Sequence, residues 1–131
     1  MEMEVAFPGG KRVEASFRGF TVKTDQPAAA GGEGTAPSPV ELFLASLATC
    51  AGFFALSFCQ DRKLPTEGLK VIQRMERDEA SHMVTKVSIE VRLPQGFPDK
   101  YKGAIVRAVE LCAVKKHLQK PPAFAVTAIE A

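Results

Sequence analysis

The residues from Leu42 to Cys59, LFLASLATCAGFFALSFC, form a stretch of eighteen residues without a charged side chain. About eighteen residues is the lower limit for a helix that crosses a bilayer, so the stretch predicts either a membrane span or a helix at the centre of a core. Ser46, Thr49 and Ser57 make it less apolar than most spans, and the segments on both sides have ordinary polarity. We therefore expect a buried core helix and no membrane insertion.

The length of the chain makes a partner for this helix the simplest expectation. A chain of 131 residues fits one domain, 1–131. A domain of this size has difficulty covering an apolar helix on all sides. Small residues recur along the helix at helical spacing and would let a second helix approach closely: Ala45, Ala48, Gly52 and Ala55. Together these features predict a homodimer.

Composition and charge exclude several classes of protein. Seventeen Lys and Arg against fifteen Asp and Glu give a net charge of +2, which argues against a nucleic-acid-binding protein. A hydrophobic content of 46% argues against disorder, and three cysteines are too few for a disulfide-stapled secreted domain. The start, MEMEVAFPGG, lacks the basic and apolar regions of a secretory signal. The expected compartment is the cytoplasm, where a cysteine that matters is more often reactive than structural.

The pattern of apolar residues predicts an α+β fold with antiparallel strands. Three short strands are expected in the first 24 residues, with turns at Pro8-Gly9-Gly10 and Arg18-Gly19. Further strands are expected over 67–75 and 87–93, a second helix over 98–118, and a last strand at Phe124, Val126 and Ile129. The predicted order is therefore β-β-β-α-β-β-α-β.

The first helix has a clear start signal. Ser38 can cap it, Pro39 suits the first helical position, and Glu41 completes a capping box. The preceding residues 25–37, DQPAAAGGEGTAP, are rich in Gly, Pro and Ala and predict a loop or a mobile flap.

The cysteines allow two interpretations. Cys50 lies in the middle of the apolar helix, where a free cysteine is commonly only a small hydrophobic residue. Cys59 lies nine residues farther along, about 13 Å away on the helix axis, whereas a disulfide needs Cα atoms within roughly 7 Å. Cys50 and Cys59 therefore cannot pair within one helix, and we expect Cys59 to be a core residue. Cys112 falls on the apolar stripe of the second helix and could pack against Cys50. The two either pack as hydrophobic residues or form a reactive pair.

A reactive Cys50 would need a source of positive charge. The dipole of its own helix acts over the first turn only, and Cys50 lies about eleven residues past the start. The candidate cations are Lys11, Arg12 and Arg18, each of which could equally be a solvated surface charge.

No metal or phosphate site is expected from the sequence. His82 and His117 are far apart and have no ligand spacing with the cysteines. The run from Gly31 to Gly34 lacks the Lys-Ser/Thr ending of a phosphate-binding loop.

Two segments resemble a known family. The segment GGEGTAPSPVELFLASLATC, residues 31–50, resembles the signature of the OsmC/Ohr family, the osmotically inducible and organic hydroperoxide resistance proteins. The segment CAVKKHLQKPPAFAV, residues 112–126, resembles the second signature of that family. The resemblance covers nearly the whole chain and implies an OsmC-like α+β fold, in which two chains intertwine around long buried helices.

The resemblance also implies a peroxidase without a bound cofactor. Cys50 would attack the O–O bond of an organic hydroperoxide, or of hydrogen peroxide, and become a sulfenic acid. Cys112 would condense with it to a disulfide, which an external dithiol would reduce. In similar proteins an Arg holds the thiolate. Here Gly9-Gly10-Lys11-Arg12 resembles the family turn, which implies Arg12, with Lys11 as the alternative.

One position departs from the family pattern. Hydroperoxide-reducing branches carry a Glu directly after the helix-starting Pro, and this Glu pairs with the Arg. This chain has Val40 there and Glu41 one residue later, which turns the carboxylate by about 100°. The chain thus resembles the OsmC-like branch more closely. The departure leaves open a second hypothesis, a small-molecule binding module or redox sensor, and a third, a structural dimer.

Overall fold

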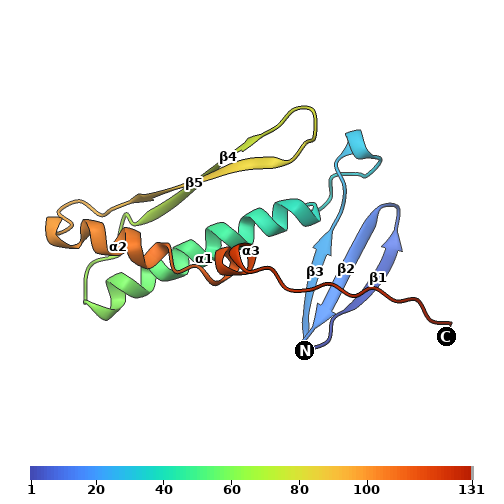
Figure 1. Ribbon diagram of the computed structural model, residues 1–131, viewed down its shortest axis with the longest axis horizontal. Coiled ribbons are helices and arrows are strands. Elements are labelled where there is room, and N and C mark those ends of the chain that lie inside the picture. The colour runs from blue at the N-terminus through green and yellow to red at the C-terminus, as the bar shows by residue number, and fades with distance from the viewer. Residues whose placement is uncertain (131) are drawn as a thin grey trace. The chain divides into compact units, whose positions relative to one another are not determined.

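The computed structural model describes residues 1–130 and shows an α+β protein whose strands all pair antiparallel (Figure 1). One sheet has three strands in the order β1-β2-β3, and the other has two, β4 and β5. The chain divides into two compact units, one from Met1 to Ala45 and one from Ser46 onward. Each unit is described by itself.

The first unit begins with a meander of three strands, as the alternation of apolar residues predicts. The strands are β1 (Glu4–Gly9), β2 (Arg12–Phe17) and β3 (Phe20–Thr24). In both turns a glycine has positive φ, +57° at Gly10 and +82° at Gly19, a region that residues with a Cβ seldom adopt. The two predicted turns are confirmed.

The loop after β3 is organised by a buried carboxylate. Asp25 is 1% exposed and accepts hydrogen bonds from the backbone N–H groups of Gln26 (2.7 Å), Glu33 (3.3 Å) and Thr35 (3.1 Å). The Thr35 hydroxyl donates a fourth hydrogen bond at 2.7 Å. The predicted loop is confirmed, and it includes a short 3₁₀ turn, η1 (Ala28–Ala30). Its extensive hydrogen bonding does not favour the predicted mobility.

These hydrogen bonds predict how stability depends on pH. The Thr35 hydroxyl and the backbone N–H groups stabilise the charged carboxylate and lower the pKa of Asp25 from 3.8 to about 2. Because the pKa is lowered in the folded state, this contribution is complete above pH 4 and is lost as the pH falls toward 2. The melting temperature of wild type should exceed that of Asp25→Asn at pH 6, and the difference should shrink by pH 2. A constant difference across this range would contradict the assignment.

The long helix α1 (Pro39–Asp61) starts where the capping pattern predicts. The Ser38 hydroxyl oxygen accepts a hydrogen bond from the Glu41 backbone N–H at 3.3 Å and donates one to the Glu41 carboxylate at 3.1 Å. Glu41 therefore acts as a capping residue.

Only part of α1 is buried within one chain, as expected for an apolar helix that a chain of this length has difficulty covering on all sides. Ala51, Ala55 and Cys59 are fully buried, whereas other apolar side chains of the helix are exposed: Val40, Phe43, Phe53 and Leu56. By length and composition α1 could cross a membrane. An 18-residue segment of it has a mean hydropathy of 2.0, and 33% of that segment is buried. One such helix is weak evidence, because the core helix of a soluble protein passes the same test.

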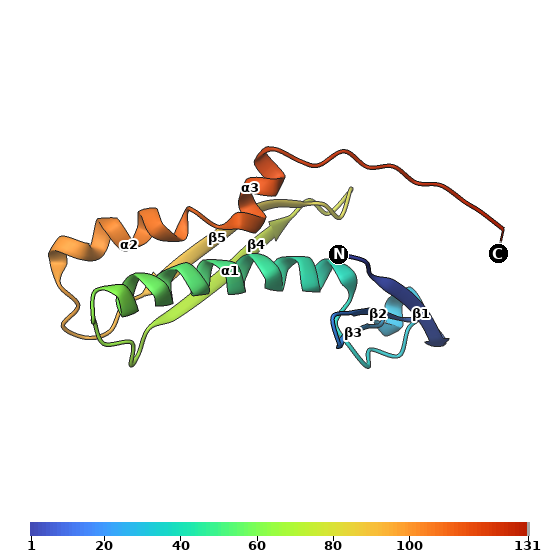
Figure 2. The same cartoon turned by 90° about the horizontal axis from the view of Figure 1, so that it is seen from below.

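The second unit packs α1 and a second helix against a hairpin. The hairpin consists of β4 (Lys70–Arg77) and β5 (Val84–Arg92), and α1 runs alongside it (Figure 2). The core joins α1 to the later helix α2 (Lys102–Val109), through Ala51, Ala55, Phe58, Cys59, Phe97, Ile105 and Val109. Val71 of β4 and Val91 of β5 pack against this cluster.

Two sequence predictions for the C-terminal third are wrong. The helix expected over 98–118 is broken into η2 (Asp99–Tyr101), α2 and α3 (Ala113–Gln119). The expected final strand is not formed: residues 121–130 have no helix or strand assignment (Figure 2), and Phe124, Val126 and Ile129 are exposed. Alternation of apolar residues favours a strand, but a strand also needs the edge of another strand with which to pair. Within the described residues of this single chain, no strand pairs with residues 121–130.

Candidate active site

The fold brings two cysteines together. Cys50 lies in the middle of α1, and Cys112 lies just before α3. Their side chains are hydrogen-bonded to each other, and neither cysteine is in a disulfide. Both belong to the second unit. Cys112 is buried and Cys50 is half-buried. The spacing of the cysteines in the sequence left this proximity open.

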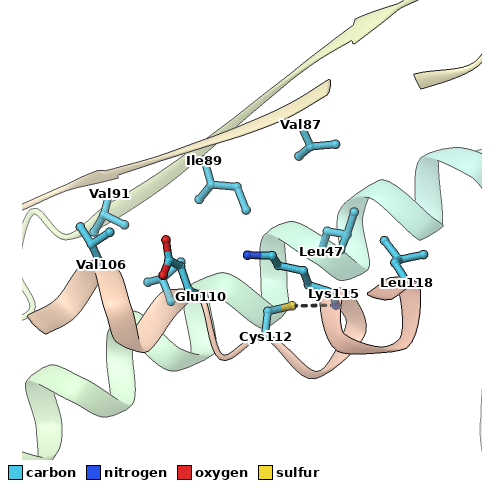
Figure 3. A pocket seen from close by; sticks show the side chains of 10 residues that line it. Leu47, Val87, Ile89, Val91, Val106, Glu110, Cys112, Lys115 and Leu118 are labelled. Carbon is cyan, nitrogen blue, oxygen red and sulfur yellow. Dashed lines mark hydrogen bonds between the residues drawn. The ribbon is translucent and has the colours of Figure 1, made fainter. Parts of the chain in front are cut away.

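The break between α2 and α3 creates this geometry. The N–H groups of Leu111 and Cys112 bond to carbonyls three residues back, at 3.1 and 3.4 Å, so the helix tightens as it ends. Cys112 then leaves the helical conformation, with φ −44° and ψ 121°, and caps α3: its sulfur accepts a hydrogen bond from the backbone N–H of Lys115 at 3.5 Å (Figure 3). The first N–H groups of α3 are therefore free to bond elsewhere.

Two of these free N–H groups point to Cys50. Burial raises the pKa of the Cys50 thiol, but hydrogen bonds from the Val114 backbone N–H, the Cys112 thiol and the Ala113 backbone N–H outweigh it, and the pKa is lowered. Burial raises the pKa of Cys112, and its hydrogen bond to Cys50 raises it further. Cys50 is thus the thiol of the pair that ionises first.

The two backbone N–H groups are the part of the site that sequence reasoning missed. We expected a side-chain cation to be needed, because Cys50 lies far from the start of its own helix. In the structure, backbone N–H groups at the N-terminus of α3 donate hydrogen bonds to Cys50. No Gly or Pro marks the break before α3, so the sequence carries no signal of it.

The contribution of these N–H groups can be measured with a proline substitution. Ala113→Pro removes one donor at the first position of α3, where proline is tolerated, and Cys112 already has the extended ψ that a residue before proline needs. We expect the pKa of Cys50 to rise, so that iodoacetamide alkylates it more slowly at pH 7. Ala113→Gly keeps the N–H and is the control. Equal alkylation profiles for the two variants would show that this N–H does not stabilise the thiolate.

The candidate cations lie in the first unit. Arg12 Nε donates a hydrogen bond to the carbonyl of Gly9 at 3.2 Å, across the turn between β1 and β2. The Arg18 guanidinium lies over the Phe20 ring, 5.5 Å from its centroid. The role of Arg12, or of Lys11, as the cation beside the thiolate stays a prediction.

Cys59 does not join the reactive pair. It is fully buried in the core, and burial raises its pKa, with a smaller opposing effect from Arg62. Residues 1–130 contain no group of three His, Cys, Asp or Glu side chains placed to hold a metal ion.

A cavity of about 410 Å³ adjoins the pair on the Cys112 side. Its walls are mostly aliphatic, with three polar exceptions, Glu110, Cys112 and Lys115 (Figure 3). The aliphatic lining comes from α1, β5, α2 and α3: Leu47, Val87, Ile89, Val91, Val106, Val109 and Leu118. Cys50 is not among the lining residues.

Comparison with known proteins shows the family of the chain. A family model for OsmC-like protein matches residues 32–127, well over half of the chain. The chain belongs to the OsmC-like family. The family match contains both cysteines of the pair, the capped start of α1 and the cavity.

Solved structures show the same fold as this OsmC-like chain. A protein from Psychrobacter arcticus 273-4 assigned to the osmotic stress and detoxification response is 24% identical, with a TM-score of 0.74 over 87% of this chain and 85% of that one. A hypothetical protein from Aquifex aeolicus VF5 has 16% identity and a TM-score of 0.65, over 92% and 87%. An organic hydroperoxide resistance protein OsmC from Legionella pneumophila, a predicted redox protein, has 20% identity and a TM-score of 0.58, over 91% and 90%. None of the curated proteins matches the sequence.

Proposed function

We propose that this OsmC-like protein is a thiol-dependent peroxidase of the cytoplasm that reduces organic hydroperoxides, and hydrogen peroxide more weakly, in defence against oxidative stress. The observation that carries the proposal is the pair itself: a thiol whose pKa is lowered, in hydrogen-bonding contact with a second thiol. A low-pKa thiol beside a resolving cysteine is the arrangement that peroxide chemistry needs. The organic hydroperoxide resistance protein from Legionella pneumophila has the same fold.

The proposed cycle begins with the Cys50 thiolate. Its sulfur attacks the distal oxygen of the hydroperoxide, the O–O bond breaks, and the alkoxide leaves and takes a proton from water as an alcohol. Cys50 is then a sulfenic acid, two electrons more oxidised. The Cys112 sulfur attacks the sulfur of the sulfenic acid, and its proton leaves with the hydroxyl group as water. The hydrogen bond between the two side chains supports this step, because it holds the attacking and the attacked sulfur near each other.

The remaining reactants follow from the cycle. An external dithiol reduces the disulfide by exchange, and no bound cofactor is needed. Cys50 is flanked on its own helix by Leu47, Phe53 and Phe54, and this apolar surface favours a bulky apolar hydroperoxide over a small polar one.

Arg12 is the proposed side-chain cation of the site. Support comes from the turn at Gly9–Arg12, which resembles the family turn, and from the charge that a thiolate prefers nearby. Arg12→Ala should slow the reaction with peroxide about tenfold or more. Arg18→Ala is the matched control, because its guanidinium lies over Phe20. If both variants react at the wild-type rate, the backbone N–H groups are sufficient and Arg12 has no role.

We also propose that the working unit is a homodimer. A second copy would cover the exposed apolar residues of α1 and of residues 121–130, which include Phe53, Phe124 and Val126. Light scattering on the purified chain should give twice the chain mass. A monomer at micromolar concentration would refute this proposal.

The experiment that tests the function follows cumene hydroperoxide with dithiothreitol as reductant. Before the reductant is added, one equivalent of peroxide should convert Cys50 and Cys112 to a disulfide, identified by peptide mass, while Cys59 stays free. Excess peroxide should then be consumed catalytically. The absence of turnover, with both thiols still free, would instead support a binding module, for which the apolar cavity of about 410 Å³ is the specific observation.

A further inference from the structure

The two sulfurs of the pair differ in their access to the cavity of about 410 Å³. Cys112 forms part of its wall (Figure 3), and Cys50 is not one of the lining residues. A molecule that occupies the cavity therefore contacts the side of the pair that the peroxide reaction does not start from.

We propose that this cavity is the entry for the reducing thiol, which attacks the sulfur of Cys112 in the Cys50–Cys112 disulfide. The inference rests on the proposed function and adds to it the sulfur that is attacked and the route of the reductant. The reductant and the peroxide then reach different sulfurs of the pair.

The exchange balances as two successive displacements. A reductant thiolate bonds to the Cys112 sulfur, and the bond between the two cysteine sulfurs breaks with its electron pair on Cys50. The second thiol of a dithiol, after losing its proton to water, attacks the reductant's own sulfur in the mixed disulfide. Cys112 leaves as a thiolate and takes up a proton, and the reductant departs as a cyclic disulfide, having supplied two electrons.

The site favours Cys50 as the leaving group. The rate of exchange rises as the pKa of the departing thiol falls. The N–H groups of Ala113 and Val114 stabilise a Cys50 thiolate and lower its pKa, whereas burial raises the pKa of Cys112. Attack on Cys50 would expel the poorer leaving group.

The cavity walls also limit the chemical class of the reductant. Seven of the ten lining residues are aliphatic, and the two charged ones, Glu110 and Lys115, have opposite signs. The volume lies within the range of about 300–1,000 Å³ that is usual for small-molecule sites. An aliphatic thiol without net charge fits these walls better than a charged, polar thiol such as glutathione.

The attacked sulfur can be identified by trapping. The disulfide is made with diamide, so that the test does not depend on peroxide activity. It is then mixed briefly with 1-butanethiol and quenched with acid, and free thiols are blocked with N-ethylmaleimide. Peptide mass analysis should find the butyl disulfide on Cys112 and the maleimide on Cys50. The butyl group on Cys50, or equally on both, would overturn the proposal.

A matched pair of variants tests the route. Leu118 lines the cavity and is 54% exposed, and Leu111 lies outside it with 51% exposed. Leu118→Trp should slow reduction by 1-butanethiol about tenfold, and Leu111→Trp less than about twofold, with oxidation by peroxide unchanged in both. Equal rates of reduction would show that the cavity is not the route.

The outcomes separate this inference from the function on which it rests. Catalytic peroxide turnover with the butyl group on Cys50 would leave the peroxidase intact and remove the inference. Absence of turnover with the butyl group on Cys112 would remove the peroxidase and leave a reducible disulfide that the cavity serves.

Discussion

Cys50→Ser should reduce the consumption of cumene hydroperoxide to the rate measured without protein. A serine hydroxyl does not ionise near neutral pH, and its oxygen cannot be oxidised to the equivalent of a sulfenic acid, so the first step of the cycle is lost entirely. Serine is nearly the same size as cysteine, and Cys50 is half-buried, so we expect the fold to survive. The measurement is the initial rate of peroxide loss with dithiothreitol, with far-ultraviolet circular dichroism to confirm folding.

The third cysteine provides the control for this variant. Cys59→Ala removes a buried thiol that has no place in the cycle and should keep the wild-type rate per folded molecule. If Cys50→Ser retains turnover, or if Cys59→Ala loses it while folded, the assignment of the nucleophile is wrong.

Cys112→Ser should separate oxidation from recycling. Cys50 still meets the peroxide, so one equivalent should be consumed rapidly. No disulfide partner remains, and Cys50 should accumulate as a sulfenic acid that dimedone labels. The N–H groups of Ala113 and Val114 remain on Cys50, so the first step should slow only modestly. The test is a stopped-flow burst of one equivalent per chain, followed by peptide mass analysis.

The opposite result for Cys112→Ser is equally informative. Sustained turnover at the wild-type rate would show that the reductant acts directly on oxidised Cys50 and that Cys112 is not the resolving cysteine. In that case the hydrogen bond between the two thiols would serve only to stabilise the Cys50 thiolate.

Local signals in the sequence were sufficient for the first half of the fold. The meander β1-β2-β3 follows from period-two alternation interrupted by turns at glycines, and both features depend on neighbouring residues alone. The start of α1 follows from Ser38, Pro39 and Glu41, whose hydrogen bonds span three residues. The family signatures are also short motifs, and they indicated Cys50 and Cys112 as the candidate reactive cysteines.

Local signals failed at the break between α2 and α3. The apolar stripe through Ile105 and Ala108 continues to Cys112 without a Gly or Pro, so periodicity predicted one helix. The structure ends α2 at Val109 and restarts at Ala113. That break exposes the N–H groups of α3 to Cys50, and this is why reasoning from α1 alone expected only a side-chain cation.

The sequence by itself indicated the strands of both sheets, where α1 starts, that the protein is OsmC-like, and which two cysteines are the candidates for the chemistry. It did so because propensity, capping and motif spacing are properties of short segments. Only the tertiary structure showed which groups surround the two sulfurs. Hydrogen bonds from Ala113 and Val114 to Cys50, and a cavity beside Cys112, join residues more than fifty positions apart, and only the packing of α1 against α2, α3 and the hairpin brings them together.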